Sequence, residues 1–321
     1  LMDLVIVGSM GYDHIQTPKV HGYDVLGGSA VHASISAAFH LPLKPGMFPR
    51  VGAIGPIGDD FREEDLRLLD ERGINIEGIS KIPGKTFRWS GRYEGTMDDA
   101  QTISTEINVL GDFNPKIPNF WKNVDILFCA NMHPSSQIKI LKECSPNISV
   151  LDTFMLWIKT EFKLLSEALR KVDIAILNEE EVCAISGEEI VTIAAEKIIS
   201  GEALFGGASA GKGPRSLIIK RGSGGVLAYL PCGIISLPSY PTKNVIDPTG
   251  CGDAFAGAML ANIVGCNGAI EDIEIMRNSL VHATITSSFI IGGLGSTNLI
   301  DLQKGKYHAR VDKYRRIVGL A

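Results

Sequence analysis

The stretch from Asn244 to Leu260, NVIDPTGCGDAFAGAML, combines residue types that suit the transfer of a negatively charged group. Its apolar residues recur at helical spacing from Gly252 onward, so the Gly-Cys-Gly turn is predicted to open a helix. The first turn of a helix leaves unpaired N–H groups at the positive end of the helix dipole. Glycine allows an anion to approach such groups closely. The turn therefore predicts a site for the negative charge that develops on a phosphoryl group during its transfer.

Asp253 places a carboxylate directly after this turn. An acidic residue in the first turn of a helix is favourable by itself, so a purely structural role is one interpretation. The functional interpretation is a general base, which accepts the proton of a substrate hydroxyl while the neighbouring N–H groups hold phosphoryl oxygens. In that case the carboxylate lies beside the anion site and faces a different atom.

Short apolar segments alternate with helical patterns along most of the chain. Several of these segments are apolar throughout, as expected of strands that are covered on both faces of a sheet. The predicted strands start at Asp3, Arg50, Asp125, Ile148, Asp173 and Ser216. The predicted helices are Ser29 to His40, Asp60 to Arg72, Ser135 to Cys144, Glu161 to Lys171, Glu179 to Ser186 and Thr192 to Ala203. This alternation predicts an α/β fold with a mostly parallel central sheet, helices on both faces and ligands at the carboxyl ends of the strands.

Residues 85–110 depart from this alternation, because they hold two β-rich runs with no helix between them. We interpret Thr86 to Tyr93 and Gln101 to Val109 as a hairpin. Together with residues 11–25, the hairpin is predicted to form a small β-lid over one edge of the main sheet. An antiparallel extension of the main sheet is the alternative. The main domain is predicted to comprise residues 1–10, 26–84 and 111–321.

The composition excludes several classes of protein. The chain has 321 residues, of which 45% are hydrophobic, and this suffices for one large α/β core. A formal net charge of −5 argues against a nucleic-acid partner. The six cysteines are scattered and form no CxxC pair, which favours reduced thiols over disulfides or a zinc site. The first apolar run lacks a basic region before it and no run is long enough to span a membrane, so we expect a cytoplasmic protein with no membrane partner.

The loop from Gly206 to Lys212, GGASAGK, matches most of the phosphate-binding pattern G-x-x-x-x-G-K-[ST]. The next residue is Gly213, which lacks the hydroxyl that would hold Mg²⁺. The loop also precedes a predicted strand, whereas a phosphate loop of this type opens a helix. We therefore expect no nucleotide site here.

The segment DPTGCGDAFAGAML resembles the C-terminal signature of the ribokinase-like (PfkB) carbohydrate kinases, a family that includes adenosine kinases. The resemblance implies a ribokinase-like fold with a small β-lid. It also implies an ATP-dependent kinase that transfers the γ-phosphoryl group to a hydroxyl of a sugar or sugar derivative. Asp253 would then be the general base, and Gly250, Cys251 and Gly252 would form the anion hole.

Further segments resemble the same family in the same order, from about Asp3 to Leu302. VGSMGYDHI implies that Asp13 binds substrate hydroxyls, and GGSAVHASISAA implies that substrate approaches the backbone at Gly27 and Gly28. LNEEE resembles the Asn-x-x-Glu motif, which implies that Asn178 lies near the nucleotide phosphates and that Glu181 organises Mg²⁺. Without the family, Asn178 and Glu181 could equally be a helix cap, and Asp13 a turn residue.

IKRGSGGVLAY resembles the nucleotide-binding strand and turn of the family, and GGLGST resembles the loop over the adenine. A hairpin-type turn is the alternative for the glycines of the first segment. The resemblance leaves open a monovalent cation such as K⁺ near the anion hole, and a homodimer formed through the lid. The residues expected along the nucleotide in these segments and the DPTG turn are Lys220, Gly222, Gly225, Thr249 and Gly295.

His32 is a departure from the family pattern, in which Asn usually stands at this position and contacts a sugar hydroxyl. Histidine can also donate or accept there, although its reach and shape differ. A helix residue packed under the lid is the alternative. This departure leaves the substrate open between a sugar and a nucleoside of the adenosine-kinase type; a regulator that binds nucleotide or sugar without catalysis is a third hypothesis. In the lid, Trp89 is expected either to stack on the substrate or to pack the inner face.

Overall fold

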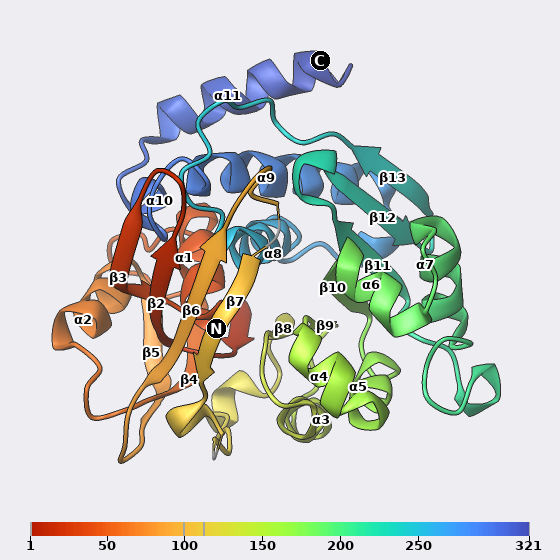
Figure 1. The fold of residues 1–321 in the computed structure, drawn as a ribbon, viewed down its shortest axis with the longest axis horizontal. Coiled ribbons are helices and arrows are strands. Elements are labelled where there is room, and N and C mark those ends of the chain that lie inside the picture. The colour runs from red at the N-terminus through yellow and green to blue at the C-terminus, as the bar shows by residue number, and fades with distance from the viewer. Residues whose placement is uncertain (1, 99, 112, 321) are drawn as a thin grey trace.

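The computed structural model describes residues 2–98, 100–111 and 113–320. In this part of the chain the large sheet has the strand order β13-β12-β11-β10-β9-β8-β1-β4-β5 (Figure 1). Its strands pair in parallel except at one edge, where β12 pairs antiparallel with both β11 and β13. All six predicted strands are present. The strands are β1 Leu4–Val7, β4 Val51–Ile57, β5 Ile74–Lys81, β8 Ile126–Cys129, β9 Ile148–Leu151, β10 Ile174–Asn178, β11 Ser216–Lys220, β12 Val226–Leu230 and β13 Gly233–Leu237.

Helices cover both faces of this sheet (Figure 1). Along β10, Ile174 and Ile176 pack into a core with α1, α8, α9 and α11, whereas Ala175 and Leu177 pack into a core with α5, α6 and α7. The alternation arises because successive side chains of a strand point to opposite faces. No helix among the described residues has the length and apolar character to cross a membrane. The helices are α1 Ser29–His40, α2 Glu63–Glu71, α3 Pro134–Glu143, α4 Met155–Thr160, α5 Phe162–Leu169, α6 Glu179–Ser186, α7 Val191–Ser200, α8 Cys251–Ala261, α9 Ile273–Ile290, α10 Thr297–Ile300 and α11 Lys304–Ile317.

A second, four-stranded sheet has the order β3-β2-β6-β7. The predicted hairpin is its β6–β7 pair, and β2 pairs in parallel with β6. The hairpin is therefore part of a separate small sheet and does not extend the main sheet. The division of the chain into a main domain and a lid remains a prediction. The strands are β2 Gly11–Gln16, β3 His21–Gly27, β6 Phe87–Tyr93 and β7 Ala100–Glu106.

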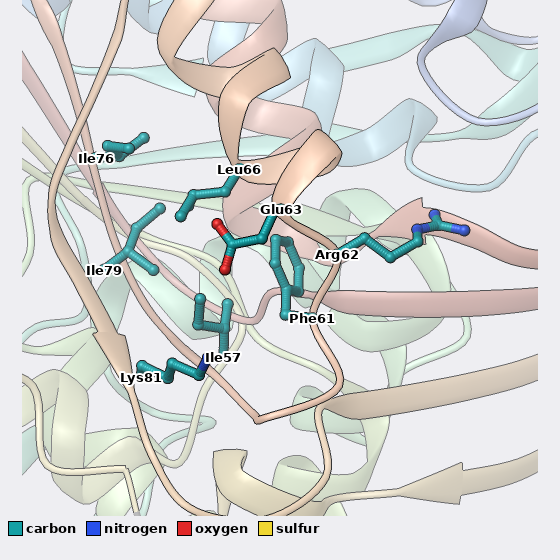
Figure 2. A pocket seen from close by; sticks show the side chains of 8 residues that line it. All are labelled: Ile57, Phe61, Arg62, Glu63, Leu66, Ile76, Ile79 and Lys81. Carbon is teal, nitrogen blue, oxygen red and sulfur yellow. The ribbon is translucent and has the colours of Figure 1, made fainter.

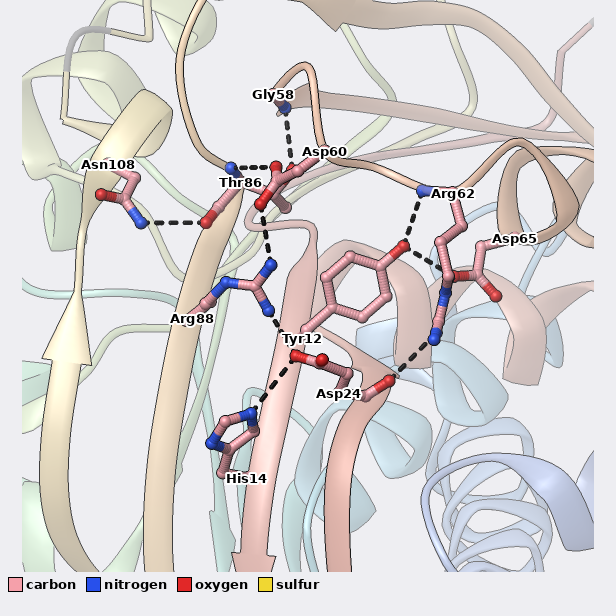
Figure 3. Close-up of polar contacts among 10 residues, drawn as sticks. All are labelled: Tyr12, His14, Asp24, Gly58, Asp60, Arg62, Asp65, Thr86, Arg88 and Asn108. Carbon is pink, nitrogen blue, oxygen red and sulfur yellow. Dashed lines mark hydrogen bonds and ion pairs between the residues drawn. The ribbon is translucent and has the colours of Figure 1, made fainter.

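Polar contacts hold the small sheet against the start of α2 (Figure 3). The hydroxyl of Tyr12 donates to Oδ2 of Asp65 (2.6 Å) and accepts from the backbone N–H of Arg62 (2.9 Å). Arg88 donates from Nη2 to Oδ2 of Asp60 (2.7 Å). Because the partners come from β2, β6 and the turn before α2, these bonds fix the orientation of the small sheet.

The predicted start of a helix at Asp60 is wrong, since α2 begins at Glu63. Oδ2 of Asp59 accepts from the backbone N–H of Gly84 (2.9 Å), and Oδ1 of Asp60 accepts from that of Thr86 (2.7 Å). Both carboxylates are thus used to anchor the chain that enters β6. They do not cap the helix.

Candidate active site

A cavity of about 270 Å³ lies between the small sheet and the carboxyl ends of the main strands. Part of its lining lies at the end of β11 or within two residues of the ends of β1, β8 and β9, where ligands of open parallel sheets bind. The sequence-predicted site residues that line it are Asp13, Gly28, His32, Trp89, Glu181, Lys220, Thr249, Gly250, Gly252 and Asp253.

The N-terminus of α8 reaches this cavity through a closely packed turn. Gly250 is the N-cap residue and has a φ of 74°, a conformation that favours glycine. A Cβ atom at Gly250 would lie 2.4 Å from the ring of His32, and one at Gly252 would lie 2.9 Å from Nζ of Lys220. Asp253 is the third residue of the helix. The two glycines therefore make room for an imidazole and an ammonium group beside the free N–H groups of the helix.

Asp247 holds the turn before α8 in place, a role that the sequence analysis did not assign. Its side chain is fully buried. Oδ1 accepts from the backbone N–H of Thr249 (2.9 Å), and Oδ2 accepts from that of Gly295 (3.0 Å). One carboxylate thus joins the predicted anion hole to the predicted adenine loop. Thr249 also donates from Oγ1 to the hydroxyl of Tyr93 in the small sheet (3.1 Å).

A cluster of buried charges occupies one end of the cavity. Nζ of Lys220 lies 3.3 Å from Oδ2 of Asp152, which the sequence analysis also missed. Burial and then the charge of Asp152 raise the pKa of Asp253 to about 6, against the opposing effects of His32 and Lys220. Burial and Asp152 also raise the pKa of Glu181 to about 8. A carboxylate with a pKa near 6 is suited to accept a proton close to neutral pH.

Asp13 and His32 form a buried pair in the same cavity. Nε2 of His32 lies 3.8 Å from Oδ2 of Asp13, which allows attraction but is too long for a hydrogen bond. Nδ1 of His32 lies 2.8 Å from Oγ of Ser296, whereas Nε2 has no hydrogen-bond partner among the described residues. A Cβ atom at Gly27 would lie 2.1 Å from Asp13, so this glycine makes room for the carboxylate. The pair therefore offers an acceptor and an unpaired ring nitrogen to a ligand.

The remaining predicted site residues lie outside the cavity lining. Asn178 accepts from the backbone N–H of Glu181 (2.7 Å), and Glu181 accepts from that of Asn178 (2.9 Å), which is a capping box. Glu181 also lines the cavity, so its structural and functional interpretations are compatible. The residues outside the lining are Gly27, Asn178, Gly222, Gly225, Cys251 and Gly295.

Glu181 and Asp152 both line the cavity and offer carboxylate oxygens, the kind of ligand that Mg²⁺ prefers. Within the described ranges no three His, Cys, Asp or Glu side chains gather into a metal-binding group. Mg²⁺ commonly binds through one or two carboxylates together with waters and substrate phosphates. The residues present therefore fit Mg²⁺ that arrives with a nucleotide.

Two other features do not belong to this site. A cavity of about 130 Å³ lies beside α2 and β5 and is lined mostly by apolar side chains (Figure 2). The loop Gly206 to Lys212 precedes β11 and does not line the large cavity.

Comparisons with known proteins place the chain among kinases. The model of the pfkB family carbohydrate kinases matches residues 47–273. A cytidine kinase of Thermococcus kodakarensis is 30% identical over 271 residues, which cover 81% of this chain and 88% of the relative. The solved nucleoside kinase of Methanocaldococcus jannaschii is 18% identical with a TM-score of 0.73 and covers 98% of this chain and 99% of its own. A putative ribokinase II of E. coli, solved with ATP and Mg²⁺, is 19% identical with a TM-score of 0.73 and covers 98% and 100%.

Proposed function

The chain belongs to the pfkB family of carbohydrate kinases. On this basis we propose which molecule accepts the phosphoryl group and which residues carry out the transfer. It is an ATP-dependent phosphotransferase that uses Mg²⁺ and acts on an alcohol group of a sugar or nucleoside. Within that class we propose that the acceptor is a nucleoside, which carries a sugar hydroxyl and a planar base.

The lining of the cavity carries this proposal. Beside Asp13 and His32, which suit sugar hydroxyls, the cavity has a large apolar and aromatic portion. A free sugar presents hydroxyls on most sides and would leave that portion unmatched, whereas a base would fill it. The similarity to a cytidine kinase supports the same choice. The apolar side chains are Phe87, Trp89, Ile107, Leu110, Phe154, Leu156 and Trp157.

Asp253 acts as the general base in the proposed mechanism. Its carboxylate accepts the proton of the acceptor hydroxyl as the hydroxyl oxygen attacks the γ-phosphorus of ATP, and ADP leaves. The backbone N–H groups of Gly250, Cys251 and Gly252 hold the phosphoryl oxygens, and Lys220 adds a positive charge beside them. Asp13, with its neighbours Gly27 and Gly28, and His32 hold the sugar hydroxyls, while Trp89 covers the acceptor from the small sheet.

Glu181, with Asp152 beside it, would hold Mg²⁺, which neutralises charge on the phosphates when it is bound. Asn178 positions Glu181 through the capping box. We place the nucleotide along Lys220, Thr249, Gly222, Gly225 and Gly295.

Further features of the proposed enzyme rest on its composition, for the location and the exclusion of nucleic acid, and on its family resemblance, for the dimer and the cation. They are a cytoplasmic location, a homodimer formed through the small sheet without nucleic acid as a partner, and a monovalent cation such as K⁺ near the anion hole. The exposed edge strand β7 is compatible with pairing between subunits.

ADP release with a panel of nucleosides and free sugars tests the function. We expect one or more nucleosides to stimulate ADP release from the wild type more than ribose or fructose does. Replacing Asp253 by Asn should lower kcat by roughly 10²- to 10⁴-fold, because it removes the proton acceptor.

The outcomes separate the substrate from the mechanism. Turnover of a free sugar but of no nucleoside would refute the nucleoside assignment. Near-wild-type turnover by Asp253→Asn would refute the base. Tight ATP binding without turnover of any panel member would instead favour a non-catalytic regulator.

A further inference from the structure

The wall of the cavity formed by the segment after β9 contains a tryptophan that the sequence analysis did not single out. Trp157 lies in α4 and lines the cavity together with Phe154 and Leu156. The small sheet contributes Phe87 and Trp89 to the same cavity. An acceptor bound between β6 and α4 would thus meet aromatic rings from two separate parts of the chain.

The ring of Trp157 is fixed by polar contacts. Its Nε1–H donates to Oδ1 of Asn131 (3.0 Å), and the ring of His133 packs edge-on against it with centroids 5.0 Å apart. His133 in turn lies 3.4 Å from Oε1 of Glu161. A ring whose rotamer is already set loses little conformational entropy when a ligand stacks on it.

The backbone around Asn131 is held as well. The buried side chain of Gln137 donates from Nε2 to the carbonyl oxygens of Ala130 (3.0 Å) and Asp152 (2.9 Å). These carbonyls follow β8 and β9, so one amide joins the two loops that carry Asn131 and Trp157. The support of Trp157 is therefore rigid and independent of the small sheet.

Trp89 differs from Trp157 both in how its ring is held and in the part of the fold that holds it. Its ring lies over its own strand, because a Cβ atom at Gly91 would lie 2.0 Å from Cη2 of Trp89. Its Nε1–H donates to Oγ1 of Thr102 in β7 (3.3 Å). Trp89 is therefore held by the small sheet, whereas Trp157 is held by α4 and the loop after β8.

We propose that Trp157 is a specificity-determining residue whose indole forms the fixed wall on which the planar base of the nucleoside stacks, with Asn131 as its positioning residue. This inference rests on the proposed nucleoside kinase activity. Asn131 lines the same cavity, and its amide nitrogen makes no hydrogen bond within the described part of the chain, so the amide is available to an acceptor atom of the base. Stacking on an aromatic side chain tolerates different bases, so this wall selects for a base and against a bare sugar.

Steady-state kinetics with the best nucleoside of the panel tests the inference. Trp157→Ala should raise the KM for the nucleoside roughly 10- to 100-fold and leave the KM for ATP within about 3-fold, because the stacking contact concerns the base alone. Trp157→Phe should retain most of the affinity, since it keeps a planar ring. Lys159→Ala, on the exposed side of the same helix, is the matched control and should behave as the wild type.

The positioning role has its own test. Asn131→Asp keeps an acceptor for the indole N–H but loses the amide donor, so it should raise the KM less than Asn131→Leu, which removes both and should raise the KM in the direction of Trp157→Ala. Intrinsic fluorescence gives a direct readout, because the chain has three tryptophans and Trp121 is fully buried in the core. Nucleoside added without ATP should quench the wild type and should quench Trp157→Phe less, with the remaining quench due to Trp89, which lines the same cavity.

The two proposals fail separately. If the wild type phosphorylates no nucleoside, the proposed acceptor class fails before any variant is made. If nucleosides are good substrates but Trp157→Ala keeps the wild-type KM and Trp157→Phe keeps the full quench, the assignment of Trp157 is overturned and the kinase function stands.

Discussion

The protonation of Asp253 links the charge cluster of the site to its pH dependence. A general base works only when it is ionised, and the pKa of Asp253 is raised to about 6 by burial and by Asp152. The kcat/KM for the acceptor reports the free enzyme and should therefore fall about tenfold per unit as the pH drops below about 6. The pH–rate profile between pH 4.5 and 8 measures this.

Substitutions of two neighbouring residues should shift the pH at which kcat/KM begins to fall, and should shift it in opposite directions. Asp152→Asn removes a negative charge and should lower the apparent pKa, whereas His32→Gln removes a group that lowers the pKa of Asp253 and should raise it. A loss of activity through misplaced substrate would change the height of the profile without shifting it. A profile that stays flat down to pH 5 contradicts Asp253 as the base.

Glu181 is the residue on which the Mg²⁺ requirement should depend. Glu181→Gln keeps an oxygen that can accept from the backbone N–H of Asn178, so the helix cap survives. We expect the Mg²⁺ concentration for half-maximal rate to rise roughly tenfold, with a smaller change in the KM of the acceptor. Glu180→Gln, exposed in the same helix turn, is the control. An unchanged Mg²⁺ titration would remove Glu181 from the metal site.

At the residue scale, the sequence predicted those site residues that lie close together within one short motif. Asp253 and the glycines before it were predictable because they lie within one turn, whose geometry follows from helix formation. Asp152 and Trp157 were not, since each becomes part of the site only when the ends of separate strands meet at one edge of the sheet. Neither residue has a neighbour in sequence that signals its role.

At the element scale, the tip of the β6–β7 hairpin docks on the turn after β11. The carboxylate of Asp98 accepts from the backbone N–H of Ser223 (2.9 Å) and from its hydroxyl (2.9 Å). Met97 beside it packs with Leu294 and Val245 in a small apolar cluster. The small sheet therefore touches the turn at Gly222 and the loop before Gly295, both of which we assign to the nucleotide, and the segment that precedes the DPTG turn.

Asp98→Ala should loosen this docking. Hydrogen bonds to a charged group contribute about 1.5–3 kcal/mol, so amide hydrogen exchange in Tyr93–Met97 should accelerate roughly tenfold or more while that of β1 stays unchanged. Glu94→Gln alters a charge in the same hairpin without a bond to the main sheet and is the control. Ser223→Ala should give a smaller effect, because the backbone bond remains. Equal exchange in Asp98→Ala and the wild type would show that this contact does not hold the hairpin.

The elements were predictable to different degrees for physical reasons. The buried central strands and α1 follow from continuous or helical apolar patterns, and α1 has the predicted bounds. The start of α2 was misplaced because Asp59 and Asp60, good capping residues by type, bond to the chain before β6 instead. A propensity for capping cannot reveal a partner 25 residues away.

At the scale of the whole molecule, a half-buried histidine pair lies between α1, α9 and α11, away from the proposed site. Nε2 of His40 lies 2.9 Å from Oγ1 of Thr286, and Nδ1 of His282 lies 2.7 Å from the hydroxyl of Tyr307. Their ring centroids are 5.9 Å apart. Burial and nearby positive charges lower the pKa of both, that of His282 to about 4.

This pair should make the fold sensitive to acid. A histidine whose pKa is lower in the folded than in the unfolded state stabilises the fold above pH 6.5, and that stability is lost as the pH falls toward 4. For His282 alone the loss of folding free energy between pH 7 and pH 5 is about 2 kcal/mol.

The variant His282→Gln tests this prediction, because glutamine keeps a polar partner for Tyr307 but cannot be protonated. Urea unfolding at both pH values should therefore show a difference smaller by about 2 kcal/mol in the variant than in the wild type. An equal difference in both proteins would mean that groups other than His282 set the acid sensitivity; the active-site carboxylates Asp253 and Glu181 are not among them, because a raised pKa in the fold adds stability as the pH falls. His21→Gln provides a matched control, because its side chain is exposed on β3, away from the histidine pair.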